Sequence, residues 1–414
     1  GAMQLRLERH VVEDVRLGEA SRLSGGCLEL HSQALAGLLR ERDSRIAAVQ
    51  VHVAKPGDRV RVVCCKDVVQ PRAKLQGGEP GAGTLRVLDR VGIATCGPIV
   101  GFQEGIIDMS GPGADYSPFS ELALIVVEIA VLDSITPHEH EAVLRAAGVV
   151  AADYVARIDV VAAPDGVELL DWQPLDDPQL PRVAYVYMLL SQGLLHDTYV
   201  LEEHAGAQLP RVIDPLLVLD NGVVSGNCVS ASDKNTTYHH QNNPVIRALL
   251  AGHGERWNFV GVVATSSPTR LSEKQGSAAQ ALKLAQELNA TGAIISKEGF
   301  GNPDADLMML VRGFEQSGIR CVAITDEFAG SDGGSQSLAD AVVEADAVVS
   351  TGNANERIVL PAMPTTIGPL PDVARIAGGY PGSIRDDGSI EVELQAIMGA
   401  TNELGFSRLS AREI

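Results

Sequence analysis

Aromatic residues are scarce in this sequence of 414 residues, making up 4% of the chain, whereas hydrophobic residues make up 45%. The interior must therefore be built from aliphatic side chains and alanine. This balance is typical of α/β proteins, whose strands are covered on both faces. A chain of this length is long enough for two or three domains, each with a core of its own.

The sequence also lacks a hydrophobic run that could cross a bilayer. Its longest apolar stretch, at 122–132, is interrupted by Glu128 and is much shorter than the ~20 residues that a membrane span needs. We interpret this stretch as one or two buried strands, and we expect no membrane partner.

Clusters of lysine and arginine are absent as well, and the formal net charge is -20. Binding to a phosphate backbone requires such clusters, so the sequence argues against nucleic acid as a partner.

The six cysteines show no Cys-x-x-Cys spacing, which is typical of a reducing compartment and not of a disulfide framework. We therefore expect a cytoplasmic protein. The adjacent Cys64 and Cys65 lie in an apolar strand pattern, where core packing is the simpler role.

Motifs for a bound cofactor or metal are missing too. The glycine-rich stretch at 75–84 is not followed by a helical pattern, which a dinucleotide fingerprint would need. His138 and His140 are two residues apart on a predicted helix that starts at Thr136, so their rings diverge and cannot share a metal. We expect no bound nucleotide, flavin or metal ion.

Apolar and helical patterns divide the chain into three parts. Residues 1–205 read as a mixed, strand-rich α/β domain, and residues 206–254 read as a bridging segment. In residues 255–414, short apolar runs alternate with helical periodicity, including a helix and a strand expected within 337–351. This alternation predicts a doubly wound domain with a parallel sheet.

Ligands of doubly wound domains bind beyond the carboxyl ends of the strands. The polar residues at these predicted ends include Glu298, Asp326, Glu327 and Asn353. We expect them to converge on one edge of the sheet and to bind an ammonium-bearing substrate.

The most polar stretch of the chain, "SASDKNTTYHHQNNP", lies at 230–244. A threonine hydroxyl becomes nucleophilic when a base removes its proton, and His239 or His240 could act as that base. We expect the Thr236 hydroxyl to attack the carbonyl of Asn235 in an N-to-O acyl shift, with Thr237 as the alternative nucleophile after a one-residue slip.

Two further pairs could assist this reaction. The amides of Asn242 and Asn243 are expected to hold the loop or an oxyanion, and His196 with Asp197 could orient the base, although a local cap is an equally good reading. The alternative for the whole stretch is a hydrogen-bonded loop whose polar side chains cap backbone groups.

Five long stretches resemble the component B proprotein of glycine, sarcosine and betaine reductases, and more distantly the D-proline reductase proprotein. They are "IVGFQEGIIDMSGPGADYSPFS" (99–120), "LLSQGLLHDTYV" (189–200), "SGNCVSASDKNTTYHHQNNPVI" (225–246), "GAIISKEGFGNPDADLMM" (292–309) and "SQSLADA" with "STGNANE" (335–356). The resemblance implies a cytoplasmic reductase subunit, made as a precursor that cleaves itself near its middle.

In that family a cysteine is the cleavage site, and the new terminus becomes a pyruvoyl group that activates an amine or amino acid. A thiol- or selenol-bearing subunit of the complex then completes the reductive cleavage of the C–N bond. Thr236 stands where we align that cysteine, so the corresponding group here would be 2-oxobutyryl. Cys228, eight residues upstream, is expected to be a small buried residue at a strand end.

Three outcomes remain open: cleavage before Thr236 with a ketoacyl group, cleavage with a free threonine, or an intact chain. An intact chain would act as a substrate-binding or scaffold subunit, or would use the threonine–histidine pocket for different chemistry in a biosynthetic pathway. The resemblance also leads us to expect an oligomer.

Overall fold

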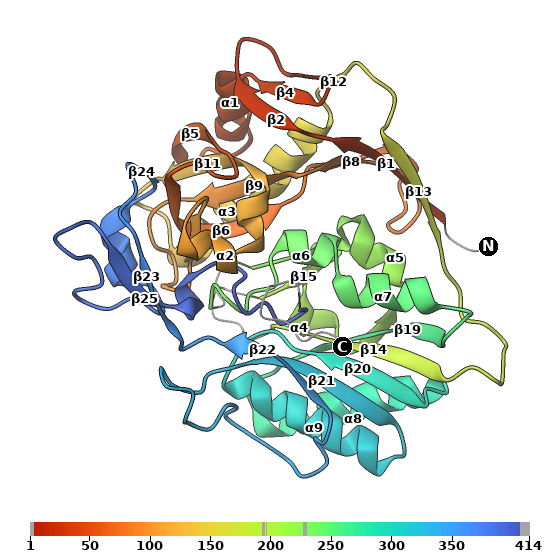
Figure 1. The fold of residues 1–414 in the computed structure, drawn as a ribbon. Coiled ribbons are helices and arrows are strands. Elements are labelled where there is room, and N and C mark those ends of the chain that lie inside the picture. Colours follow the sequence, from red (N-terminus) through yellow and green to blue (C-terminus); the bar gives the residue numbers. More distant parts are fainter. Residues whose placement is uncertain (1–3, 193–194, 196, 227–229, 406–414) are drawn as a thin grey trace.

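The computed structural model describes residues 4–192, 195, 197–226 and 230–405, and it shows a mixed α/β protein. The strands of the first part of the chain form the upper half of the molecule in Figure 1, and a mainly parallel sheet with its helices forms the lower half. The central segment lies between these halves.

The central sheet of the upper half has the order β10-β6-β9-β11-β5. Its strands are β5 (Ile46–Ala54), β6 (Val60–Val69), β9 (Val91–Cys96), β10 (Gly105–Asp108) and β11 (Ala123–Val131). The predicted apolar run is the single strand β11, which confirms the interpretation as a buried strand. Cys64 and Cys65 are buried in β6, as expected from their pattern.

Helix α3 (Pro137–Ala156) packs its alanine and valine face against this sheet. It begins as the sequence predicts, with Thr136 as N-cap and Glu139 closing a capping box. Helix α1 (Ser32–Arg42) covers β5. The smaller helical elements nearby are α2 (Pro112–Tyr116) and η1 (Pro118–Glu121).

Two smaller sheets complete the upper half, with the orders β13-β1-β8-β7 and β12-β3-β4-β2. Their strands are β1 (Gln4–Val11), β2 (Asp14–Leu17), β3 (Arg22–Ser24), β4 (Cys27–Leu30), β7 (Arg72–Gln76), β8 (Gly83–Asp89), β12 (Asp159–Val160) and β13 (Gly166–Asp171).

The sheet of the lower half has the order β17-β19-β14-β20-β21-β22, and all neighbouring pairs are parallel except β17 with β19. Its strands are β14 (Arg182–Leu189), β17 (Arg211–Ile213), β19 (Asn258–Ser266), β20 (Gly292–Ser296), β21 (Arg320–Glu327) and β22 (Val348–Asn353). Helices α8 (Leu271–Glu287) and α9 (Asn302–Gln316) cover one face, and α7 (Pro244–Gly252) covers the other.

Short elements connect the two halves. They are β15 (Tyr199–Val200), β16 (Glu203–His204), α4 (Ala205–Gln208), α5 (Pro215–Leu217), η2 (Val218–Gly222), β18 (Val223–Val224) and α6 (Thr237–Gln241). Helix α6 packs on β6 of the upper half and on η2.

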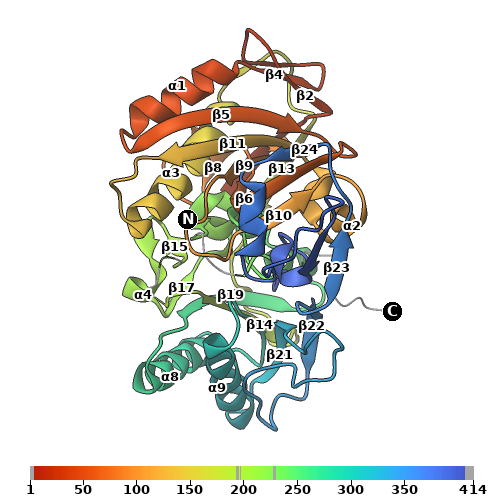
Figure 2. The same ribbon diagram turned by 90° about the vertical axis from the view of Figure 1, so that its left-hand side faces the viewer.

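Two segments extend beyond the part of the chain to which the sequence analysis assigns them. Strand β14 precedes residue 205 but is paired with β19 and β20 of the lower sheet. After β22 the chain returns to the upper half, where β24 (Thr365–Ile367) pairs with β6, as Figure 2 shows. The remaining elements are β23 (Arg357–Leu360), β25 (Ile390–Glu393), η3 (Leu370–Ala374) and η4 (Leu394–Ala396).

The helix expected within 337–351 does not form, although the strand β22 does. Residues 337–347 form turns and irregular backbone, in which Leu338, Val342 and Ala345 pack against the core of the lower half. The helical spacing of these apolar residues was therefore misleading, because a loop that lies over a core needs the same side chains.

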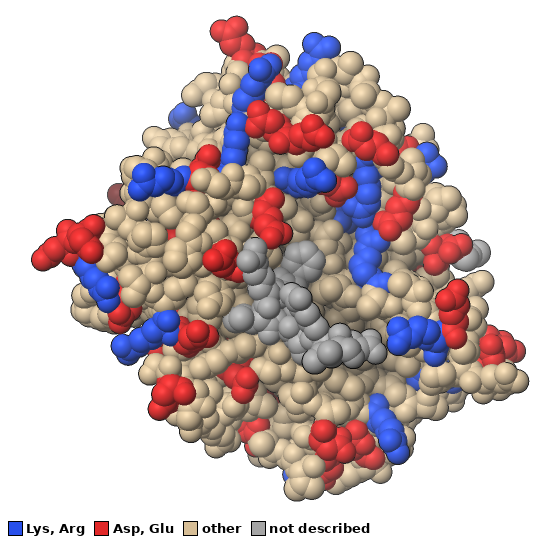
Figure 3. Space-filling model, viewed as in Figure 1, with Lys and Arg blue, Asp and Glu red and all other residues tan. Residues whose placement is uncertain are grey.

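The distribution of surface charge concerns the expectation about nucleic acid, and the helices concern the expectation about a membrane. Figure 3 shows lysine and arginine side chains scattered among acidic ones on one face. Within the described ranges, every helix is either too short or too polar to span a membrane.

Candidate functional site

The central segment enters the protein interior with Asp233, Lys234 and Asn235, whose side chains are all buried. The Lys234 ammonium donates to the backbone oxygen of Gly226 at 2.7 Å and to that of Lys66. The Asn402 amide donates to Asn235 Oδ1 at 2.7 Å and to Lys234 O at 2.9 Å. Contacts from distant parts of the chain thus hold this segment in place.

Thr236 is the N-cap of helix α6 and is fully buried. Its hydroxyl oxygen accepts the backbone N–H of His239 at 3.2 Å and lies 3.1 Å from His239 Nδ1. The backbone N–H of Thr236 donates to the same Nδ1 at 3.1 Å, which completes a capping box. The predicted hydroxyl and base are therefore neighbours, and they also cap the helix.

The protonation state of His239 follows from these contacts. Because Nδ1 accepts the Thr236 N–H, it carries no proton and can receive one from the Thr236 hydroxyl. Burial, with a smaller contribution from the charge of His240, lowers the pKa of His239 to about 3. His239 is thus neutral at physiological pH, and it is a weak base.

Thr237 contacts Asp67, whereas the sequence suggests His239 or His240 as the base. Its hydroxyl donates to Asp67 Oδ2 at 2.6 Å, and its backbone N–H donates to Asp67 Oδ1 at 2.9 Å. Asp67 lies on β6, and burial raises the pKa of its carboxyl group, against the opposing effects of Lys234 and Thr237. The base that can accept a proton from Thr237 is therefore Asp67.

His240 lies on the side of α6 that faces the lower sheet. Its Nε2 is 3.7 Å from Glu298 Oε2, and its Nδ1 is bonded to the Tyr187 hydroxyl. Thr198 donates to the other oxygen of Glu298 at 2.8 Å. The structure thus brings predicted catalytic and substrate-binding residues, His240 and Glu298, into direct contact.

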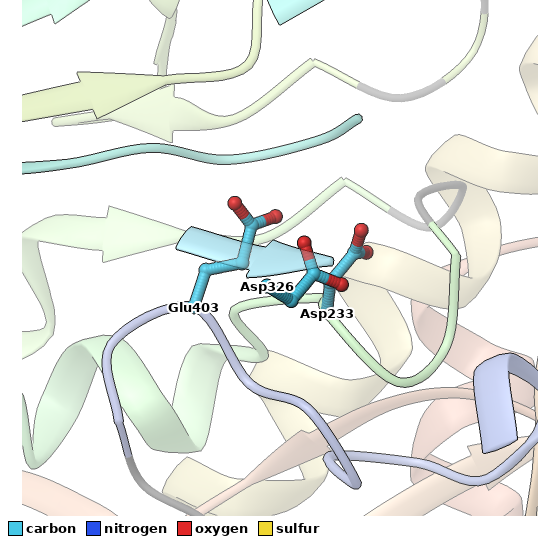
Figure 4. A group of neighbouring side chains, drawn as sticks. All are labelled: Asp233, Asp326 and Glu403. Carbon is cyan, nitrogen blue, oxygen red and sulfur yellow. The ribbon is translucent and has the colours of Figure 1, made fainter. Parts of the chain in front are cut away.

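Asp326, at the end of β21, lies beside two acidic residues that the sequence analysis does not select, Asp233 and Glu403. Figure 4 shows their carboxylates gathered at the strand end. Burial raises the pKa of Asp326 to about 7, partly opposed by the charge of Lys297. Burial would lower the pKa of Lys297, but Glu403 and Asp304 outweigh it and raise that pKa.

The two predicted asparagines have structural partners. Asn243 is the N-cap of α7, where it accepts the N–H groups of Val245 and Ile246. Asn242 accepts a hydrogen bond from Arg72 at 3.1 Å, and Arg72 lines a cavity of about 960 Å³. Both residues hold the ends of helices, and their role toward an oxyanion remains a prediction.

Glu327 and Asn353 are paired positions on β21 and β22. Glu327 accepts from the Ser350 hydroxyl, and Asn353 bonds the backbone of Ala329 and Gly330. These contacts hold the two strand ends together, and the predicted role of Glu327 and Asn353 toward the substrate stays a prediction. His196 lies outside the described residues, and Asp197 is paired with His204.

Several residues of the site were not predicted from the sequence. Lys66 and Asp67 interrupt the apolar pattern of β6, and this charged pair inside a buried strand was the available signal. Asn402 and Glu403 are near the carboxyl end of the described chain, and their pattern gives no such signal. Tyr187 is an ordinary core residue by its pattern.

Buried ionisable groups are costly to folding, and proteins concentrate them where they act on a substrate or an ion. The fold and the site therefore define a mixed α/β protein with a buried cluster of polar and ionisable residues between its two halves. The chain belongs to the family of glycine/sarcosine/betaine reductase component B subunits, whose family model matches residues 3–412.

Component B subunits of glycine, sarcosine and betaine reductase complexes match 99% of this chain. It is 45% identical over 427 residues to glycine reductase complex component B subunits alpha and beta of Peptoclostridium acidaminophilum, covering 99% of this chain and 100% of the relative. It is 42% identical over 427 residues to the sarcosine reductase component B subunit alpha of that organism, with the same coverage.

Two relatives from Acetoanaerobium sticklandii differ in how much of the chain they cover. The D-proline reductase proprotein of Acetoanaerobium sticklandii is 24% identical over 349 residues, which are 77% of this chain and 54% of the relative. The glycine reductase complex component B subunits alpha and beta of Acetoanaerobium sticklandii are 44% identical over 429 residues, or 99% of this chain and 100% of the relative. No solved structure matches.

Proposed function

We propose that this chain is a subunit of a cytoplasmic, oligomeric reductase complex that reductively cleaves the C–N bond of a small amine or amino acid. The observation that carries the proposal is the full-length similarity to component B subunits of glycine and sarcosine reductase complexes. The word "component" in these names supports further subunits as partners, and we propose that one of them bears a thiol or selenol.

We further propose that the chain cleaves itself in its central segment. Two relatives of equal length are single chains that carry the name of two subunits, alpha and beta. Such a name is expected when one precursor divides into two products. The word "proprotein" in the name of the D-proline reductase relative supports the same reading.

Thr236 is the first candidate for the nucleophile. Its hydroxyl is buried, 3.1 Å from an acceptor nitrogen of His239, and it follows Asn235, whose side chain Asn402 holds. An acyl shift to this oxygen, followed by elimination and hydrolysis with loss of ammonia, would leave a 2-oxobutyryl terminus. That ketone would supply an electrophilic carbonyl for an amine substrate.

Cys228 is the second candidate, and one observation favours it. The Thr236 oxygen already accepts a hydrogen bond as a helix cap, beside a histidine whose pKa is lowered to about 3. Asn227-Cys228 repeats the pairing of Asn235-Thr236, an asparagine followed by a nucleophile. A thiol ionises far more readily than a hydroxyl, and cleavage there would give a pyruvoyl terminus.

Mass spectrometry of the freshly purified protein tests the cleavage and its position. Cleavage before Thr236 gives an amino-terminal fragment that ends at Asn235, whereas cleavage before Cys228 gives one that ends at Asn227. The carboxy-terminal fragment should react with a carbonyl reagent. The variants Thr236→Val and Cys228→Ala identify the nucleophile, because only one of them should remain intact. An intact wild-type mass contradicts self-cleavage.

Glu298 is the carboxylate that we place nearest the substrate amine, with His240 beside it, and Asp326 and Glu327 are the further choices. The alternative function is an uncleaved substrate-binding or scaffold subunit, favoured by the capping role of Thr236. In that case an intact chain would support full activity of the reconstituted complex, and neither Thr236→Val nor Cys228→Ala would reduce it.

A further inference from the structure

Three carboxylates from distant parts of the sequence converge in the interior. Asp233 comes from the segment before α6, Asp326 from the end of β21, and Glu403 from the segment after η4. Each residue has an exposed fraction of 0%. One oxygen of each lies within 4.8 Å of the others, as Figure 4 illustrates.

The oxygens at this meeting point lack hydrogen-bond donors. Both oxygens of Asp233, Oδ1 of Asp326 and Oε2 of Glu403 are buried and accept no hydrogen bond from the described residues. Asp326 Oδ2 accepts from the Thr401 hydroxyl at 3.1 Å, and Glu403 Oε1 accepts from the Gly299 N–H at 2.8 Å. Two carboxylates are thus each oriented through one oxygen while the other is left open, as in metal sites.

The positive charge nearby does not balance this group. Lys297 is the ammonium that lies near it, 3.7 Å from Glu403 Oε2, but Lys297 is also bonded to Asp304. If Asp304 neutralises Lys297, three carboxylates remain without a counter-charge in the interior. Because uncompensated buried charge is expensive, such a group must either keep protons or bind a cation, and a cation that enters the cluster would displace those protons.

We propose that Asp233, Asp326 and Glu403 bind one divalent metal ion of the hard class, such as Mg²⁺, Mn²⁺ or Ca²⁺. Ligands that are all oxygen select such ions. Oxygens on opposite sides of an ion with bonds of ~2.0–2.6 Å lie up to about 4–5 Å apart, which agrees with the span of 4.8 Å. An organic ammonium would need space for its carbon atoms, and these carboxylates are buried on all sides.

The ion has a structural consequence for the central segment. Asp233 is two residues from Asn235, so the metal would fix this segment to β21 and to the segment that carries Asn402. The sequence shows no metal motif because the three ligands are spread over 170 residues, between positions 233 and 403. The inference does not depend on the cleavage position, but it assigns Asp326 to the metal ion and so leaves Glu298 and Glu327 as the carboxylates proposed to bind the substrate amine.

Metal content and thermal stability of the full-length protein test the proposal. The purified protein should contain about one equivalent of a divalent metal by elemental analysis. After chelation and removal of the chelator, calorimetry should show one site for Mn²⁺, Mg²⁺ or Ca²⁺, and the same ion should raise Tm. Neither readout depends on reductase activity.

The variant Asp233→Asn should raise one quantity and lower another: Tm without metal, and the rise in Tm that metal causes. It removes one of the repelling carboxylates, so it should raise Tm of the metal-free protein, while abolishing the metal-dependent rise. Glu298→Gln, a buried carboxylate outside the cluster, is the matched control and should retain metal binding. The proposal is overturned if no ion binds or if Asp233→Asn binds the ion as wild type does. It is also overturned if glycine raises Tm of the metal-free wild type but not of Asp233→Asn, because the cluster would then bind an ammonium group.

Discussion

The Asp67 carboxylate on β6 accepts both the hydroxyl and the backbone N–H of Thr237, at 2.6 and 2.9 Å. It thereby joins a strand of the upper half to the first turn of helix α6. All the atoms involved are buried, so neither partner can be replaced by water. This pair fixes where the central segment lies on the upper sheet.

Asp67→Asn should weaken this junction. The amide group keeps the volume but has one acceptor oxygen in place of two, so one of the two Thr237 donors loses its acceptor, and a buried unsatisfied donor costs about 1–3 kcal/mol. We expect the free energy of unfolding, measured in urea, to fall by ~2 kcal/mol. The exposed Asp386→Asn is the control, and an equal loss in both variants would contradict the role of Asp67.

Substitutions of Thr236 should separate its capping role from any role in cleavage. Thr236→Ala removes the cap of α6 and should lower the free energy of unfolding by about 1 kcal/mol. Thr236→Ser keeps both the cap and the hydroxyl, so its stability should stay close to wild type. If Thr236 is the nucleophile, the serine variant should still cleave, and its terminal group should be lighter by one methylene unit.

The outcome of these two variants is informative in either case. Should Thr236→Ala divide as fast as wild type, the hydroxyl is a cap alone and Cys228 becomes the nucleophile to test. Should Thr236→Ala stay intact while Cys228→Ala divides, the threonine is the reacting residue. Circular dichroism of each variant would show that α6 and the rest of the fold persist.

Local patterns predicted much of the fold. The apolar run at 122–132 became β11, and the capping signal at Thr136 began α3. Both features depend on residues that are close in sequence, which is where propensity and patterning act. The helix expected within 337–351 does not form, because the spacing of its apolar residues reflects their contacts with the core of the lower half.

The site could be predicted only where its residues are neighbours along the chain. The hydroxyl of Thr236 and the ring of His239 are three residues apart, and the structure brings them within 3.1 Å. Asp67, Asn402 and Glu403 reach the same segment through tertiary contacts, which one sequence does not encode locally. For this reason the sequence pattern did not indicate that Asp233 and Glu403 lie beside Asp326.

Glu298→Gln should affect the substrate rather than the fold. Glu298 faces His240 at 3.7 Å and is held by Thr198, and the glutamine can keep the bond from Thr198. In the reconstituted complex we expect KM for the amine to rise about tenfold, since one charge-assisted contact is worth about 1.5 kcal/mol. Unchanged KM with reduced self-cleavage would assign Glu298 to processing instead.

The metal-free protein should lose stability as pH rises through the acidic range. Burial raises the pKa of Asp326 to about 7, whereas in the unfolded chain it is ~3.9, so between these values the folded state holds a proton that the unfolded state has released. Asp326→Asn should therefore weaken this dependence in urea unfolding with chelator present, whereas burial also raises the pKa of Asp233 and of Glu403, whose contributions have the same sign and remain in the variant. His239, whose pKa is lowered to about 3, acts in the opposite direction below pH ~6.5, so the comparison must be between variant and wild type. Parallel curves for the two proteins would contradict a contribution of Asp326 to the pH dependence.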